Sequence, residues 1–138
     1  MNAKIFMVRY LSEKAKTLSS GKFLTYREIP WGEVYFRQFQ GRCLMRLAFS
    51  YGNKLEAFKK VMTAMGAKPL EQGDCAFELE FMEGFFIRLI LWEGDDEFPP
   101  SSQILFSDNF AVTFAAEDLA VAGDICINMM KAVERKLS

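Results

Sequence analysis

Residues 75–92 read CAFELEFMEGFFIRLILW, and this stretch decides the expected fold. Every second residue from Cys75 to Phe81 is apolar, with Glu78 and Glu80 among the residues between them. The same alternation returns after a turn, from Phe85 to Leu91. A period of two residues is typical of strands with one buried face. The stretch therefore predicts a β-hairpin at the centre of a small antiparallel sheet.

The length of the hairpin loop follows from which side chains must share a face. A two-residue loop, 83–84, would place Leu79 opposite Arg88 and mix the apolar face with the polar one. A three-residue loop, 82–84, places Leu79 opposite Ile87 and sets Arg88 against a glutamate of the first strand. We therefore predict the three-residue loop, with its glycine in the left-handed conformation.

Four segments have the apolar spacing of three to four residues that is typical of amphipathic helices. They are residues 3–17, 36–51, 53–65 and 115–136. Asn53, followed three residues later by Glu56, resembles a capping box for the third helix, and Gly66 supplies its C-terminal stop. Gly41 is a weak point inside the second helix. Residues 22–32 and 93–102 are expected to be irregular, and residues 103–106 to form a short strand.

These elements place the chain in the α+β class. We expect a single domain over residues 1–138, in which N-terminal and C-terminal amphipathic helices pack on an antiparallel sheet built around the 75–92 hairpin. The chain has 138 residues, of which 51% are hydrophobic and 25% charged. A chain of this length and composition can form one hydrophobic core that needs no disulfide or metal ion for stability.

Charge and cysteine content exclude several classes of partner and compartment. The net charge is −1, from 17 basic and 18 acidic residues, and no segment concentrates lysine and arginine. We therefore expect no binding to nucleic acid. No segment has the pattern of a transmembrane helix or a signal peptide, so we expect no membrane association either. The three widely spaced cysteines favour a cytoplasmic protein without disulfides.

The chain contains no histidine. It therefore lacks the commonest general base, the usual metal ligand, and every Ser–His or Cys–His pair. It also lacks the GxGxxG, P-loop, GxSxG and HExxH motifs. Most familiar hydrolase mechanisms are thereby excluded, although the sequence does not decide whether the chain is an enzyme, and it indicates no cofactor.

Acidic residues cluster after the hairpin, where Glu93, Asp95, Asp96 and Glu97 lie within five residues. Carboxylates gathered in this way bind hard cations, and two that share a site raise one pKa and create a general acid. Asp95 and Asp96 are the candidate metal ligands, and Glu97 joins them as a candidate ligand-binding residue. The alternative is a solvated turn, because the order DDEFPP does not match a calcium-binding loop.

Other candidate ligand-binding residues lie beside this loop and on the last helix. Trp92 and Phe98 flank the acidic residues and would line a pocket, unless they simply anchor the loop to the core. Glu117 and Asp118 join the loop carboxylates only if the last helix begins beneath the loop. Otherwise they are acidic residues placed at the positive end of that helix, where they favour its macrodipole.

The acidic loop also lies within a recognisable signature. Residues 92–99 read WEGDDEFP, which fits the pattern W-x-G-D-D-E-F-P. The other matching segments are Gly21-Lys22, YREIP at 26–30, Gly73-Asp74, Ser102, Leu105-Phe106 and Glu117-Asp118-Leu119. Together they resemble an uncharacterised prokaryotic family, a domain of unknown function seen largely in anaerobic bacteria and archaea. The resemblance implies a bacterial or archaeal cytoplasmic protein and supplies no activity.

Three classes of function remain. The first is a binding module, in which the acidic loop, 93–98, and the adjoining aromatics hold a small ligand or a divalent metal ion. The second is a structural or protein-interaction domain that acts as a homodimer. The third is a carboxylate-dependent, metal-assisted enzyme, with Asp95, Asp96 and Glu117 as metal ligands or acid–base groups.

Overall fold

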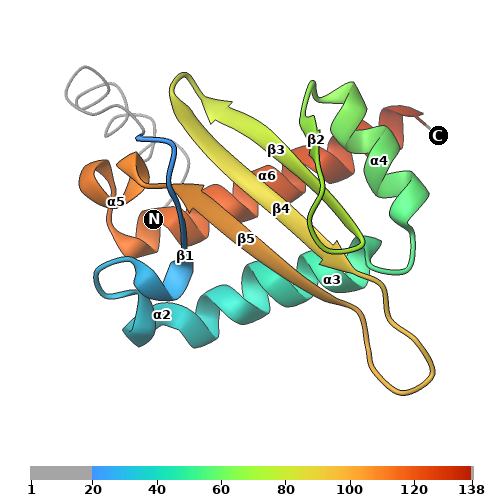
Figure 1. The fold of residues 1–138 in the computed structure, drawn as a ribbon, viewed down its shortest axis with the longest axis horizontal. Helices are drawn as coiled ribbons and strands as arrows, with labels where there is room; N and C mark the ends of the chain where they lie inside the picture. Colours follow the sequence, from blue (N-terminus) through green and yellow to red (C-terminus); the bar gives the residue numbers. More distant parts are fainter. Residues whose placement is uncertain (1–19, 138) are drawn as a thin grey trace.

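The 75–92 stretch forms the central hairpin of the sheet in the computed structural model, which describes residues 20–137. Five antiparallel strands have the order β1-β5-β4-β3-β2. Their bounds are β1 Phe23–Thr25, β2 Lys68–Leu70, β3 Cys75–Met82, β4 Phe85–Trp92 and β5 Ser101–Ser107. The predicted α+β class and the antiparallel sheet around this hairpin are therefore confirmed (Figure 1).

The hairpin has the predicted register but a different turn. Leu79 lies opposite Ile87, and Arg88 Nε donates to Glu78 Oε1 over 2.9 Å. Met82, however, pairs with Phe85, so the turn contains two residues rather than three. A bulge between Glu80 and Met82 absorbs the extra residue and keeps the apolar face continuous. The glycine of the turn is left-handed, as predicted, with φ 83°.

Helices occupy most of the remaining chain. Their bounds are η1 Tyr26–Glu28, α2 Gly32–Phe39, η2 Gln40–Met45, α3 Arg46–Tyr51, α4 Leu55–Ala64, α5 Asn109–Thr113 and α6 Ala116–Leu137. The predicted second helix is the run α2-η2-α3, and η2 is a π-helical turn that contains Gly41. At the predicted weak point, Gly41, the helix therefore widens locally into a π-helical turn and does not break. The predicted helix over residues 3–17 lies outside the described residues.

Two expectations about local structure are wrong, and one strand was not predicted. Asn53 does not cap α4, because Lys54 is its N-cap residue and the Asn53 side chain accepts a hydrogen bond from the Gly94 backbone instead. The expected irregular segment 22–32 contains β1 and η1, and β2 has no counterpart in the prediction. These two strands are only three residues long. Such strands form by pairing with β5 and β3 rather than by their own pattern.

One hydrophobic core joins the sheet to the helices. The inward side chains of β3, β4 and β5 belong to the same buried cluster as Phe39, Cys43, Leu47 and Tyr51 of the α2-η2-α3 run. Figure 1 shows α6 crossing behind the sheet, and its residues Leu119, Cys126 and Met130 join this cluster. Helix α6 therefore packs against the sheet, as predicted for the C-terminal helix. None of the helices within residues 20–137 is long and apolar enough to cross a membrane.

Candidate functional site

The acidic loop is a structured turn that Asp95 organises. Its Oδ1 atom accepts hydrogen bonds from the backbone amides of Glu97 and Phe98, both over 2.8 Å. These two bonds lower the pKa of the Asp95 carboxyl because they favour its ionised form. The Asp95 amide in turn donates to the Phe98 carbonyl over 2.8 Å. The carboxylate predicted to hold a metal ion is therefore engaged by its own loop.

Two further side chains anchor the base of this loop. Asp74 Oδ2 accepts from the Glu93 amide over 2.7 Å, and Asn53 Oδ1 accepts from the Gly94 amide over 3.2 Å. Gly94 lies so close to Pro100 that a Cβ atom at this position would be 2.6 Å from the proline nitrogen. The loop is thus fastened at its base by side chains from two other segments of the chain.

The remaining candidates of the loop face outward. Asp96 and Glu97 are exposed, and the exposed fractions of Trp92 and Phe98 are 41% and 67%. Within residues 20–137, no group of three acidic or cysteine side chains is placed to hold a metal ion. The loop therefore presents carboxylates and an aromatic ring to solvent without enclosing a site.

Glu117 and Asp118 do not join the loop. Strand β5 carries the chain from the loop to the opposite end of the sheet, where α5 and then α6 begin (Figure 1). Asp118 is buried, and its Oδ2 atom accepts from the Ala115 amide over 3.0 Å at the start of α6. Asp118 therefore has the helix-start position that the simpler interpretation gave it, and a site shared with the acidic loop is not formed.

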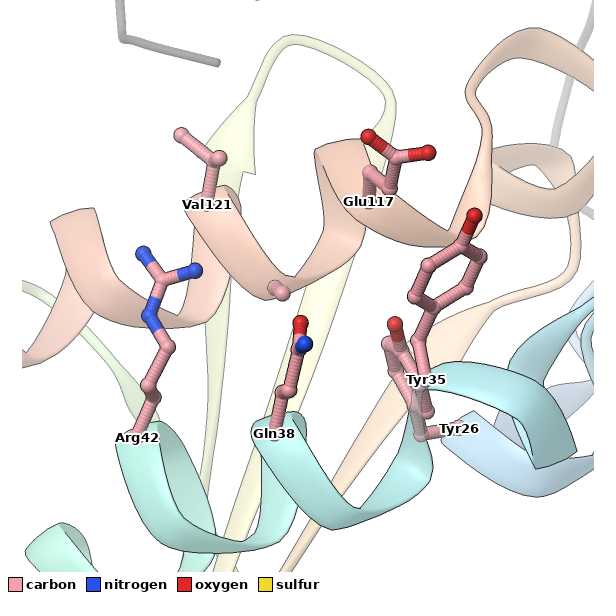
Figure 2. Close-up of a pocket in the computed structure, with 7 residues that line it drawn as sticks. Tyr26, Tyr35, Gln38, Arg42, Glu117 and Val121 are labelled. Carbon is pink, nitrogen blue, oxygen red and sulfur yellow. The ribbon is translucent and has the colours of Figure 1, made fainter.

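Glu117 instead lies beside a hollow between α6 and the α2-η2 segment (Figure 2). We call this hollow, of about 210 Å³, the trough. Its described lining residues are Tyr26, Tyr35, Gln38, Arg42, Glu117, Ala120 and Val121. Most of these side chains are polar, in contrast to the apolar core on the other side of the same helices.

Helical periodicity brings the trough residues together. Tyr35, Gln38 and Arg42 are three and then four residues apart, so they follow one another along one face of the α2-η2 run. Figure 2 shows these three side chains extending toward α6, where Glu117 and Val121 are one helical turn apart. Because both walls are helices, the side chains project from a rigid backbone.

Tyr26 forms the floor of the trough. Its hydroxyl donates to the Ala116 carbonyl over 2.8 Å, and its ring stacks on Phe39 with a centroid distance of 4.0 Å. Burial is the main cause that raises the pKa of Tyr26 to about 12. The ring therefore connects the trough to the hydrophobic core and keeps its proton at neutral pH.

The two ends of the trough carry opposite charge. At one end, Arg42 Nη2 lies 2.8 Å from Asp124 Oδ2, and Arg46 Nη1 lies 3.1 Å from Asp124 Oδ1. The Asp124 carboxylate therefore forms salt bridges with both guanidinium groups. At the other end, the charge of the Glu117 carboxylate, together with a hydrogen bond between the two side chains, raises the pKa of Tyr35. The Tyr35 hydroxyl points toward Glu117 in Figure 2.

Comparison with known families then identifies the chain. A family model described as a domain of unknown function, DUF3786, matches residues 1–129. The chain belongs to this family. The predicted resemblance to an uncharacterised domain family is thereby confirmed. No curated protein and no solved structure matches the chain.

The segments on which the predicted resemblance rested have two kinds of position in this DUF3786 domain. Asp74, Gly94 and Asp95 hold the acidic loop in shape through backbone contacts. Tyr26 and Glu117, which belong to other such segments, lie together in the trough although they are far apart in sequence. These segments therefore include both the loop at one end of β5 and part of the polar hollow near the other.

Among the residues that line the trough of the DUF3786 domain, only Glu117 was a candidate from the sequence; the missed residues include Tyr35, Gln38 and Arg42. Their spacing along the polar face of a predicted helix was available as a signal. A polar helical face is normally a solvated one, so the pattern becomes informative only when α6 is known to lie opposite. The same holds for Asp124, because its arginine partners come from a different helical segment of the chain.

Proposed function

We propose that this DUF3786 domain is a small-ligand-binding module and that the trough is its site. The observation that carries the proposal is the convergence of Tyr35, Gln38, Arg42 and Glu117 on one hollow from two facing helices. Polar groups fixed on rigid elements around a concave surface are what orients a ligand and selects it. Ligand binding was also the first of the three classes that the sequence left open.

The size of the trough limits the ligand. Its volume of about 210 Å³ lies below the roughly 300–1,000 Å³ that is usual for pockets of drug-sized molecules. The polar lining favours a ligand that forms hydrogen bonds or carries charge. We therefore propose a metabolite-sized polar molecule rather than an apolar cofactor.

The acidic loop supports this function less well than the trough does. Its Asp95 carboxylate already accepts two backbone hydrogen bonds. The exposed Glu93, Asp96 and Glu97 are not gathered, within residues 20–137, into a group that could hold a metal ion, whereas calcium prefers six to eight oxygen ligands. A divalent metal site at the loop would depend on water or on a partner for its other ligands.

Titration of ¹⁵N-labelled protein with a library of polar fragments, followed by NMR, tests the proposal. We expect shift changes to cluster on the trough residues and to disappear in the Gln38→Ala/Glu117→Ala variant. Arg37→Ala is the matched control, because Arg37 is an exposed residue of the same helix that does not line the trough. Shift changes that map elsewhere, or that survive in the double variant, would contradict the proposal.

A second candidate function is self-association through an apolar patch beside the acidic loop. Phe98, Phe49 and Met45 are 67%, 63% and 48% exposed. Met45 and Phe49 line a groove of about 260 Å³, together with Leu44, Ala48, Pro99 and Pro100 among others, and Phe98 directly precedes Pro99 in the chain. A projecting ring and a groove on the same surface suit a two-fold interface, in which each copy inserts Phe98 into the other.

Sedimentation equilibrium tests this second function. We expect a concentration-dependent dimer that the Phe98→Ala variant loses, whereas Val112→Ala, which removes an exposed side chain on α5, should keep it. A wild-type chain that stays monomeric at several hundred micromolar would remove the homodimer from consideration.

We also propose a cytoplasmic location in a bacterium or archaeon. All three cysteines are unpaired and buried, as expected for a chain in a reducing compartment. The family resemblance favours the same compartment.

A further inference from the structure

We infer that the ligand of the trough is a small zwitterion, with its ammonium group against Glu117 and Tyr35 and its carboxylate against Arg42. This inference rests on the proposed function and adds the chemical class of the ligand to it. It follows from the distribution of charge along the trough, from the apolar wall between the charged ends, and from the distance between those ends.

The Glu117 end is the negative one. Among residues 20–137, Glu117 forms no salt bridge, and the neutral Tyr35 hydroxyl points toward it in Figure 2. An exposed carboxylate with an aromatic ring beside it binds an ammonium group by charge and by contact with the ring. A cationic group of the ligand is therefore favoured at this end.

The Arg42 end has an excess of positive charge. Asp124 carries one negative charge and contacts both Arg42 and Arg46, so one of the two positive charges is not neutralised. Arg42 uses Nη2 for Asp124, and a guanidinium has five N–H donors in total. The donors that remain on Arg42 fit a carboxylate, which guanidinium groups bind in paired hydrogen bonds.

The middle of the trough suits an uncharged, partly apolar segment. Ala120 and Val121 line one side, and Gln38 stands between the two charged ends in Figure 2. The Gln38 amide both donates and accepts hydrogen bonds, so it pairs equally well with an amide of the ligand. This arrangement favours a peptide bond or a short methylene chain between the two charged groups.

The spacing of the ends selects among zwitterions. Tyr35 and Arg42, like Glu117 and Asp124, are seven residues apart, which is about 10 Å along a helix. The glutamate and arginine side chains are long enough to contact a ligand that is shorter than this separation. A dipeptide spans about 7 Å, whereas the two charges of an α-amino acid are only a few bonds apart. The trough therefore fits a dipeptide of small residues, or an ω-amino acid of similar length, better than an α-amino acid.

Isothermal titration calorimetry with capped and uncapped probes tests the inference. The probes are Ala-Ala, N-acetyl-Ala-Ala, Ala-Ala-amide, 6-aminohexanoate and alanine. We expect Ala-Ala or 6-aminohexanoate to bind, and removal of either charge from Ala-Ala to weaken binding at least tenfold. Alanine should bind more weakly than both.

Charge variants assign each group to its end of the trough. Glu117→Gln should abolish the preference for a free ammonium and leave the preference for a free carboxylate. Arg42→Gln should do the reverse, and Arg42→Lys should restore part of the carboxylate preference. Arg37→Gln is the matched control, and circular dichroism must show that each variant is folded.

The possible outcomes separate the two proposals. Equal binding of capped and uncapped Ala-Ala would overturn the inference, as would the absence of binding by both Ala-Ala and 6-aminohexanoate at millimolar concentration. If polar fragments still bind in the trough in that case, the ligand-binding function stands and only the zwitterion is wrong. If no fragment binds there either, both proposals fail.

Discussion

Acidic residues of this chain differ in function according to the donors that they face. Asp95 and Asp118 both accept hydrogen bonds from backbone amides, the first within a loop and the second at a helix start. Asp124 instead accepts from two arginine side chains, and Glu117 is exposed at the rim of the trough. A carboxylate bound to backbone amides maintains local structure, whereas one that faces a hollow is available to a ligand.

Removing the Asp95 carboxylate should loosen the acidic loop without unfolding the protein. In Asp95→Ala, the amides of Glu97 and Phe98 lose their acceptor, so their hydrogen exchange should accelerate while the melting temperature changes little. Asp96→Ala is the matched control, since Asp96 is an exposed neighbour with no hydrogen bond or salt bridge to the rest of residues 20–137. Hydrogen exchange measured by NMR distinguishes the two variants, and equal rates in both would contradict the role of Asp95.

Buried thiols should make the protein less stable in alkaline solution. Burial raises the pKa of Cys43 and of Cys126 to about 12, from 9.0. The folded state then keeps protons that the unfolded state loses, so this stability is present below pH 9 and declines as the pH rises toward 12. Each thiol contributes a loss of about 1.4 kcal/mol per pH unit in that range.

Urea unfolding at pH 8, 9, 10 and 11 measures this dependence. The Cys43→Ala/Cys126→Ala variant should start less stable, because it loses buried side-chain volume, but its stability should fall less steeply above pH 9. Parallel curves for the variant and the wild type would show that the two thiols are not the groups responsible.

At the scale of elements, the crossing of η2 and α6 builds the trough. The π-helical turn places Cys43 against α6, where its Sγ atom lies 3.5 Å from the Ala120 carbonyl. Gly123 allows this close approach, since a Cβ atom there would lie 2.8 Å from the same sulfur. On the side of η2 toward the acidic loop, the Ser102 hydroxyl donates to the Leu44 carbonyl. The π-helical turn thus contacts α6 beside the trough and the start of β5 next to the acidic loop.

Two glycine substitutions test this crossing. Gly123→Ala should destabilise the protein by about 1–3 kcal/mol, because the new methyl group overpacks a buried sulfur. Gly41→Ala should be neutral or stabilising by about 0.4–1 kcal/mol, because nothing lies within 4 Å of the added Cβ atom. Free energies of unfolding from urea titration compare them, and a Gly123→Ala variant as stable as Gly41→Ala would show that the helices separate easily.

At the scale of the whole molecule, β5 separates the two surfaces for which we propose a function. The strand begins at Ser101, next to the acidic loop and the apolar patch, and ends at Ser107, from which α5 leads to the start of α6 (Figure 1). One buried cluster includes residues from the sheet, the α2-η2-α3 run, α4 and α6. The trough and the loop are therefore held on a common core while lying apart on the surface. The proposed ligand and the proposed second copy would then occupy different surfaces.

A substitution in the centre of this core should destabilise every element together. Leu89 is completely buried, so Leu89→Ala should cost about 2–5 kcal/mol and keep a single unfolding transition. Val112→Ala, at a side chain that is 76% exposed, should change the stability by less than about 0.5 kcal/mol. Calorimetry and far-ultraviolet circular dichroism follow the transition, and a second transition in Leu89→Ala would indicate that the helices and sheet unfold as separate units.

The sequence by itself determined the hairpin, its register and the three longest helical segments of the described chain, which are α2-η2-α3, α4 and α6. Apolar and polar residues alternate around Leu79 and Ile87, and only one pairing of the two strands keeps all the apolar side chains on one face. The register therefore follows from the sequence alone. The same holds for Gly66, whose left-handed conformation at the end of α4 follows from its missing side chain. The two-residue turn was not predicted, because a bulge produces the same register as a longer loop.

Only the tertiary structure decided which polar residues meet. The trough joins Tyr35, Gln38 and Arg42 to Glu117, about eighty residues later in the chain, and no local pattern encodes which face of α6 lies opposite α2. The acidic loop is the opposite case. Its acidic residues are close together in sequence and predicted a binding site, but in the structure Asp95 accepts hydrogen bonds that hold the loop in shape. Side-chain periodicity is a local property that sequence displays, whereas a binding site depends on long-range packing.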